Sequence, residues 1–187
     1  MKKYVIIAGV NGAGKSTLYL TSPSLKNLER INTDEILREW GDWRNPTDVI
    51  KAGKLSLQKL SACFANNISI NQETTLCGHS IIRNIESAKD KGYIIELHYV
   101  GVDSVEIAKD RVSKRVAMGG HGIPEKDIER RYYESFKNLN TIINKCDLIA
   151  FYDNTESFRR FAIYKNGIPV RISKKIPSWF ERYISNN

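Results

Sequence analysis

A glycine-rich stretch near the amino terminus has the clearest chemical signature in the sequence. Residues 9–16 read GVNGAGKS and fit the pattern G-x-x-x-x-G-K-[ST]. In this pattern the glycines let main-chain amides approach phosphate oxygens, Lys15 places a cation at the β- and γ-phosphates, and Ser16 offers a hydroxyl to Mg²⁺. The pattern therefore predicts a nucleotide-binding loop. The expected nucleotide contacts are Gly9, Asn11, Gly12, Ala13, Gly14, Lys15, Ser16 and Thr17, and Ser16 is also the expected metal ligand.

Two carboxylates follow predicted strands and could act on a phosphoryl acceptor. Asp34 lies in INTDEIL, just beyond a short strand, where a parallel sheet points residues toward its ligand cleft. There it could orient and deprotonate a hydroxyl group. The alternative is that Thr33 or Asp34 only caps the helix EILREW, with Glu35 in its first turn.

Glu73 ends another predicted strand, in NQETTLCG. This carboxylate and the hydroxyls of Thr74 and Thr75 could hold acceptor hydroxyls or a metal-bound water. The alternative is the polar end of an edge strand. We expect all three residues to contribute to the acceptor site.

Arginines on two predicted helices could surround a phosphoryl group. Arg111 and Arg115 are four residues apart, so they share one edge of the helix that follows Ser104. On the next helix, Arg131 borders the buried face and Arg130 points further out. Arginine suits this work because its planar fork stays charged and can hold two phosphate oxygens. Solvated helix faces are the alternative.

The glycine-rich segment MGGHGIP joins these two helices and makes them resemble a nucleotide lid with glycine hinges, over about residues 111–131. His121 lies in this segment and could contact phosphate or substrate. Asp103 and Asp153 follow apolar strands as the metal-binding acid of an ATPase motor does, but we interpret both as helix-cap or turn residues.

Composition limits the class of protein. A chain of 187 residues suits one domain, and its net charge of +8 favours anionic ligands such as nucleotides or nucleic acid. The three cysteines are scattered, which favours reduced thiols in a cytoplasmic protein over a disulfide framework or a zinc site. The run YVIIAGV is too short for a secretory signal, and no run could span a membrane.

Short apolar runs alternate with helical stretches, which predicts an α/β fold with a mainly parallel sheet. Strands are expected at 4–8, 30–32, within 68–76, at 93–102 and within 147–154, and helices from 15, within 46–67, 79–92 and 105–117, and at 125–145. Ile50, Leu57, Leu60 and Phe64 are expected on the buried face of the second of these helices. A hairpin that turns at Asn166-Gly167, followed by a helix, should occupy about 159–185.

Five segments together resemble a known family: YVIIAGVNGAGKST, INTDEI, ETTLCG, RVSKRVAMGGHGIPEKDIERRYYESFKNL and FYDN. They are similar to the zeta-toxin-like P-loop kinases, in particular the small bacterial branch often labelled predicted ABC-type ATPases, over about residues 3–154. The resemblance implies a three-layer kinase-type fold, dependence on ATP and Mg²⁺, and transfer of the γ-phosphoryl group to a small acceptor. In characterised zeta toxins that acceptor is a hydroxyl of UDP-N-acetylglucosamine, and an antitoxin protein is the partner that the family suggests.

By this resemblance Lys15 and Ser16 match the phosphate-loop residues, Asp34 the catalytic base and Glu73 the acid near the acceptor. The first lid arginine of the family falls on Arg115. The second falls on Arg131, on Arg130 or on the position of His121. Arg111 and Arg115 also resemble the paired arginines of adenylate-kinase-like enzymes, of which one lies against adenine.

The sequence thus predicts a small-molecule kinase with Asp34, Lys15, Arg115 and Arg131 as catalytic residues. Two alternatives remain at this stage. The net charge of +8 would also suit a polynucleotide kinase, although no basic motif with interleaved aromatic residues is present. A nucleotide-dependent binding module would bind ATP and phosphorylate nothing.

Overall fold

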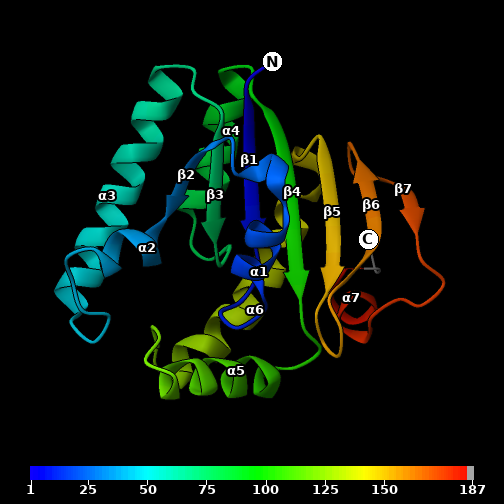
Figure 1. Cartoon of the computed structure of the whole chain (residues 1–187). Helices are drawn as coiled ribbons and strands as arrows, with labels where there is room; N and C mark the ends of the chain where they lie inside the picture. Colours follow the sequence, from blue (N-terminus) through cyan, green and yellow to red (C-terminus); the bar gives the residue numbers. More distant parts are fainter. Residues whose placement is uncertain (185–187) are drawn as a thin grey trace.

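The computed structural model describes residues 1–184, which contain a seven-stranded sheet in the order β2-β3-β1-β4-β5-β6-β7. Strands β1 to β5 pair in parallel, and β6 and β7 continue the sheet as an antiparallel hairpin. Figure 1 shows α1 in front of this sheet and α4 and α6 behind it. The predicted α/β fold with a mainly parallel sheet is confirmed.

The strands are β1 (Lys3–Ala8), β2 (Glu29–Asn32), β3 (Ile70–Thr74), β4 (Ile94–Gly101), β5 (Leu148–Asp153), β6 (Arg159–Lys165) and β7 (Ile168–Ile172). The helices are α1 (Lys15–Thr21), α2 (Thr33–Arg38), α3 (Pro46–Ala65), α4 (Ser80–Asp90), α5 (Val105–Ala117), α6 (Glu125–Ile142) and α7 (Ser178–Tyr183), with 3₁₀ turns at Pro23–Leu25 and Ile143–Lys145.

Pairing of the parallel strands brings the candidate site residues to one edge of the sheet. Strand β1 lies between β3 and β4, so the loop after Ala8 opens at the centre of that edge. The last residue of β2, Asn32, is in register with Glu73 on β3. The phosphate-loop motif, the start of α2 and the end of β3 are therefore neighbours, as expected at the carboxyl ends of parallel strands.

Helix α3 exposes part of the face that the sequence led us to expect inside. Leu60 and Phe64 are buried, but Ile50 is 61% exposed and Leu57 is 42% exposed, so those two assignments are wrong. The helix covers the β2 edge of the sheet and buries a narrower stripe that includes the small side chains of Ala52 and Ser56. Small residues let a helix approach a sheet closely, and a count of large apolar residues does not detect them.

The hairpin and the C-terminal aromatic residues match their prediction. Asn166 and Gly167 have φ angles of 49° and 77°, as a tight hairpin turn requires. Trp179 and Phe180 on α7 are buried. The last residue of the predicted segment, 185, lies outside the described residues. None of the helices in residues 1–184 is long and apolar enough to cross a membrane.

Asp103, which follows β4, and Asp153, the last residue of β5, form hydrogen bonds to other groups of the protein. Asp153 accepts hydrogen bonds from the Trp179 indole at 3.1 Å and the Thr155 hydroxyl at 2.7 Å. Asp103 accepts from Ser178 and from the main-chain N–H of Trp179, at 2.7 and 3.1 Å. Both carboxylates thus hold the C-terminal segment in place, and Asp153 also accepts from the main-chain N–H of Thr155 at 3.2 Å, as the predicted turn residue would.

Candidate active site

The phosphate-loop motif is fixed by close packing of its own backbone. Gly9 has φ +140°, and a Cβ there would lie 2.2 Å from the carbonyl oxygen of Val100 on β4. Gly14 has φ +106°, and its Cβ would lie 2.4 Å from the side-chain nitrogen of Asn154. That nitrogen donates to the carbonyl oxygen of Ala13 at 2.8 Å. These glycines are therefore required by packing, before any phosphate is considered.

Two cavities open beside the loop, of about 650 and 360 Å³. The expected nucleotide contacts Asn11, Gly12, Gly14, Lys15, Ser16 and Thr17 line the larger cavity. Gly9 and Ala13, also in the loop motif, are buried and do not line this cavity. Thr74 and Thr75 line the smaller cavity. The two cavities share Asn11, Lys15, Asn32, Asp34 and Glu73, so they meet where the sequence places the lysine and both acids.

Lys15 lies at this junction with its side chain turned into its own loop. It is buried, and its Nζ donates to the carbonyl oxygen of Val10 at 3.1 Å. Burial lowers the pKa of Lys15, while the neighbouring carboxylates of Glu73 and Asp34 oppose that shift. A phosphate group would replace the carbonyl oxygen as the stronger acceptor for this cation.

Ser16 and Glu73 present oxygen atoms that suit Mg²⁺. The Ser16 hydroxyl donates to Glu73 Oε1 at 3.1 Å, and both residues line the larger cavity. Hard divalent cations prefer such oxygen ligands, and Mg²⁺ is usually bound by few protein groups together with phosphates. Residues 1–184 hold no cluster of three or more His, Cys, Asp or Glu side chains that could bind a metal by themselves. The residues present therefore fit a metal ion that enters with a nucleotide.

Asp34 is not the cap of its helix. The side chain of Asn32 caps α2 by accepting from the main-chain N–H groups of Asp34 and Glu35, at 2.9 and 3.4 Å. The alternative in which Thr33 or Asp34 caps this helix is therefore wrong. The Asp34 side chain is 41% exposed and lines both cavities. Its carboxylate is available to a bound molecule.

His121 approaches Asp34 from the loop between α5 and α6, residues 118–124. Its Nε2 lies 3.6 Å from Asp34 Oδ1, and its ring centroid lies 5.7 Å from that of Trp43. The imidazole is only 11% exposed. Burial lowers the pKa of His121, Asp34 opposes this, and Arg115 adds to it. This loop thus reaches the carboxylate for which the sequence predicts a catalytic role.

The two arginines of α5 line the larger cavity with unused hydrogen-bonding capacity. Arg111 donates from Nη2 to the carbonyl oxygen of Thr155 at 3.0 Å, whereas its Nη1 is buried and has no partner among the described residues. Nε and Nη2 of Arg115 are likewise buried and unpaired within residues 1–184. Unpaired guanidinium groups inside a cavity are costly, and an anionic ligand would satisfy them.

The two candidate arginines of α6 have different surroundings. Arg131 donates from Nη1 to Asn11 Oδ1 in the phosphate loop at 3.2 Å. Arg130 is 57% exposed and pairs with Asp127 and Glu134, at 3.1 and 2.8 Å. Both line the smaller cavity. Of the two, Arg131 is the one with a hydrogen bond to the phosphate loop.

Arg30 is a cleft residue that the sequence did not reveal. It lies on β2 and forms ion pairs with Glu35 and Glu73, at 2.7 and 2.8 Å. Asn154, which braces the loop, and Trp43, which packs against His121, were also not singled out. One signal for Arg30 was available in the sequence. It is a charged residue inside a short strand, and the helix that follows carries Asp34 and Glu35 in its first turn.

We compared the chain with family models, curated proteins and solved structures. The family model described as zeta toxin matches residues 1–166. An uncharacterised protein of Haemophilus influenzae is 32% identical over 130 residues, which are 70% of this chain and 92% of that protein.

Among solved structures, a chain of the AvrRxo1-ORF1:AvrRxo1-ORF2 complex with sulphate ions is 13% identical, with a TM-score of 0.75 over 97% of this chain and 63% of that one. A structure of that complex with ATP gives a TM-score of 0.73 at 12% identity. A chain from the PezAT chromosomal toxin–antitoxin system of Streptococcus pneumoniae is 16% identical, with a TM-score of 0.61 over 85% of this chain and 70% of that one. These structural likenesses show a shared fold, and this chain spans less than two thirds of the AvrRxo1 chain.

Proposed function

The chain belongs to the zeta toxin family, and we propose that it is an ATP-dependent kinase that transfers the γ-phosphoryl group to a hydroxyl of a small molecule. One observation carries the proposal. The phosphate-loop cavity and a second cavity meet at Lys15, Asp34 and Glu73. A triphosphate held on one side would therefore end beside a carboxylate that faces space for an acceptor, which is the arrangement that phosphoryl transfer needs.

The nucleotide would be held by the loop and by α5. Main-chain amides of the loop, the N-terminus of α1 and Lys15 suit the β- and γ-phosphates. The unpaired guanidinium atom of Arg111 suits the adenine end of the nucleotide, and those of Arg115 suit the phosphates. Ser16 and Glu73 would hold Mg²⁺ and its water. The metal would supply charge neutralisation between the β- and γ-phosphates.

In the reaction, Asp34 would accept the proton of the acceptor hydroxyl as its oxygen bonds to the γ-phosphorus. The bond from that phosphorus to the bridging oxygen breaks, and ADP leaves. Lys15, Arg115 and Arg131 would stabilise the negative charge on the transferring group, because preorganised cations lower the barrier most where charge develops. Arg130 and His121 would contact the acceptor.

UDP-N-acetylglucosamine is the best single candidate for the acceptor. Family membership supports it, and so does the lining of the smaller cavity, where Thr74, Thr75 and Glu73 offer hydroxyl and carboxylate groups to a sugar. The toxin–antitoxin system among the structural neighbours supports an antitoxin as protein partner. We also propose a cytoplasmic location, where ATP and nucleotide sugars are available.

The test is incubation with ATP, Mg²⁺ and a panel of nucleotide sugars, followed by mass spectrometry for a product heavier by one phosphate. Asp34→Asn should reduce transfer by about 10²–10⁴-fold and leave ATP binding unchanged. Asp110→Asn is the matched control, since Asp110 is exposed on α5 and pairs only with Lys114 among the contacts described.

Full activity of the Asp34→Asn variant would refute the base assignment. Transfer to oligonucleotides in place of nucleotide sugars would favour the polynucleotide-kinase alternative. ATP binding without transfer to any acceptor in the panel would favour the binding module.

A further inference from the structure

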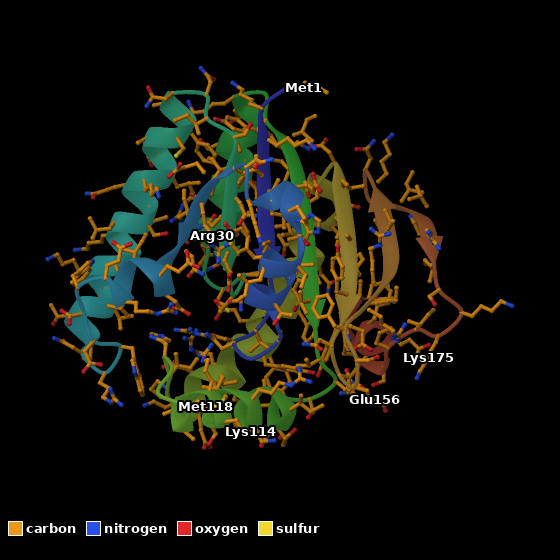
Figure 2. The ribbon with its side chains drawn as sticks, viewed as in Figure 1. Met1, Arg30, Lys114, Met118, Glu156 and Lys175 are labelled. Carbon is orange, nitrogen blue, oxygen red and sulfur yellow. The ribbon has the colours of Figure 1, made fainter. Side chains whose placement is uncertain are left out.

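Arg30, on β2, connects several elements of the cleft wall and is labelled left of the centre of Figure 2. Its Nε and Nη2 donate to Glu35, at 2.9 and 2.7 Å, and Nη2 also donates to Glu73 Oε2 at 2.8 Å. Its Nη1 donates to Asn71 at 3.1 Å, and the guanidinium carbon lies 3.6 Å from the centre of the Tyr19 ring. Strands β2 and β3 and helices α1 and α2 all contribute to its surroundings, so the guanidinium is held in one orientation.

This orientation decides where the Glu73 carboxylate points. Arg30 binds Oε2 of Glu73, while Oε1 accepts the hydrogen of the Ser16 hydroxyl at 3.1 Å. A planar guanidinium can bind Glu35 and Glu73 at once because its donors diverge in a fixed fork. An ammonium group at the same place would retain the charge and lose the fork.

The same contacts neutralise a cleft that must receive an anion. Without Arg30, the carboxylates of Glu35 and Glu73 would lie near each other beside a bound triphosphate, and like charges in a partly buried site repel strongly. Glu35 also lies in the first turn of α2, next to Asp34. The Arg30–Glu35 pair therefore ties the start of that helix to β2.

We propose that Arg30 is a positioning residue that aims Glu73 at Ser16 and thereby sets the place of the metal ion that accompanies the nucleotide. Through Glu35 it also fixes the helix that carries Asp34. Arg30 itself touches neither phosphate nor acceptor in this role, because its donors are already directed at protein oxygens. The inference rests on the proposed nucleotide-dependent function, but not on the identity of the acceptor.

The test measures Mn²⁺ binding by electron paramagnetic resonance in the complex with adenylyl imidodiphosphate, a non-hydrolysable ATP analogue. Arg30→Lys keeps the charge, so long-range attraction for nucleotide and metal is preserved. We expect about tenfold weaker Mn²⁺ binding, in the range seen when a group that orients a metal ligand is changed. Affinity for the analogue in EDTA should change by less than about threefold, because Lys15 and the loop are untouched.

Lys59→Arg is the matched control, at a residue of helix α3 that contacts the main chain of Arg30. Lys59 donates to the carbonyl oxygen of Arg30 and pairs with Glu29, but it does not line either cavity. This reciprocal exchange should leave Mn²⁺ affinity unchanged within about twofold.

Glu35→Gln is a second variant in case Arg30→Lys does not fold. It leaves Arg30 in place and weakens its anchor on α2, so a loss of about twofold to fivefold in Mn²⁺ affinity is expected. Wild-type Mn²⁺ affinity in the folded variants would overturn the assignment of Arg30. Failure of the wild-type protein to bind the analogue would instead count against the proposed function, so the two failures are distinguishable.

Discussion

The two sides of the cleft are built by different means. On the phosphate side, the loop is held by its backbone, with Gly9 against the carbonyl of Val100 and the carbonyl of Ala13 bonded to Asn154. On the acceptor side, partly exposed side chains hold one another, as Arg130 does with Asp127 and Glu134.

Because of this difference, we expect the two sides to tolerate substitutions differently. A phosphate group is the same in every nucleoside triphosphate, so a rigid main-chain cradle serves it well. Acceptors differ between kinases, and exposed ion pairs contribute little to folding free energy. Substitutions on the acceptor side should therefore change activity with little loss of stability, whereas substitutions in the loop should change both.

The largest effect is expected from Gly9→Ala. The new Cβ would lie 2.2 Å from a main-chain oxygen, at a φ of +140° that alanine rarely adopts. Strain and overpacking together should lower the free energy of unfolding by about 3 kcal/mol or more, and ATP binding should be lost. Urea denaturation and calorimetric titration with ATP measure the two effects.

Gly53→Ala is the control for this exchange. Gly53 lies inside α3, and a Cβ there would meet nothing within 4 Å. The substitution should raise the free energy of unfolding by about 0.5–1 kcal/mol. If Gly9→Ala and Gly53→Ala changed the free energy of unfolding equally, close packing of the loop backbone would not be the feature that distinguishes the phosphate side.

Arg115→Met should have the next largest effect, and on activity alone. The Nε and Nη2 atoms of Arg115 are unpaired in residues 1–184, so their removal breaks no hydrogen bond of the fold. If Arg115 stabilises the transferring phosphoryl group, kcat should fall by about 10³-fold. The melting temperature should stay the same or rise. A large drop in melting temperature would mean that Arg115 is a structural residue.

Arg131→Met and Arg130→Met form a pair that sharpens the comparison within the lid. Arg131 contacts Asn11 in the phosphate loop, and its removal should reduce kcat by about 100-fold. Arg130 is paired with Asp127 and Glu134, and its removal should reduce kcat by less than about fivefold. Steady-state kinetics at saturating ATP measures both. The reverse order of effects would assign the second lid position to Arg130.

Local sequence was sufficient to predict most of the elements and the position of the phosphate-loop motif after β1, because both depend on residues that are close in the chain. The glycine pattern of the loop and the apolar run of β1 each lie within a single short segment. Helix α3 shows the limit of this information. Ile50 and Leu57 have helical spacing, but only the sheet edge beneath α3 decides which side of the helix is buried.

The cleft wall formed by β2, α2 and β3 was less predictable because its contacts join distant segments. The place of Asp34 after β2 was predictable, but the alternative of a helix cap named Thr33 or Asp34 and missed Asn32, since all three residue types can act as caps. Arg30 binds a carboxylate 43 positions away, and pairing of β2 with β3 brings the two together. No spacing rule reports such a contact.

The smallest effect is expected from the pH dependence of stability at His121. Burial lowers the pKa of His121 below the ordinary value of 6.5, the carboxylate of Asp34 opposes the shift, and Arg115, Arg38 and Arg131 add to it. As pH falls through 6.5, the unfolded chain therefore binds a proton at this residue before the folded protein does. Folding stability should be fully present above that pH and decrease below it.

His121→Gln should remove this contribution, since glutamine does not titrate. The drop in melting temperature between pH 7.5 and pH 5.5 should be smaller in His121→Gln than in the wild-type protein, and His79→Gln, at an exposed histidine, should behave like wild type. If the loop between α5 and α6 lay away from Asp34 in solution, His121 would lose its burial and the two glutamine variants would show the same drop in melting temperature. The experiment therefore also reports whether this loop keeps the position that brings His121 to Asp34.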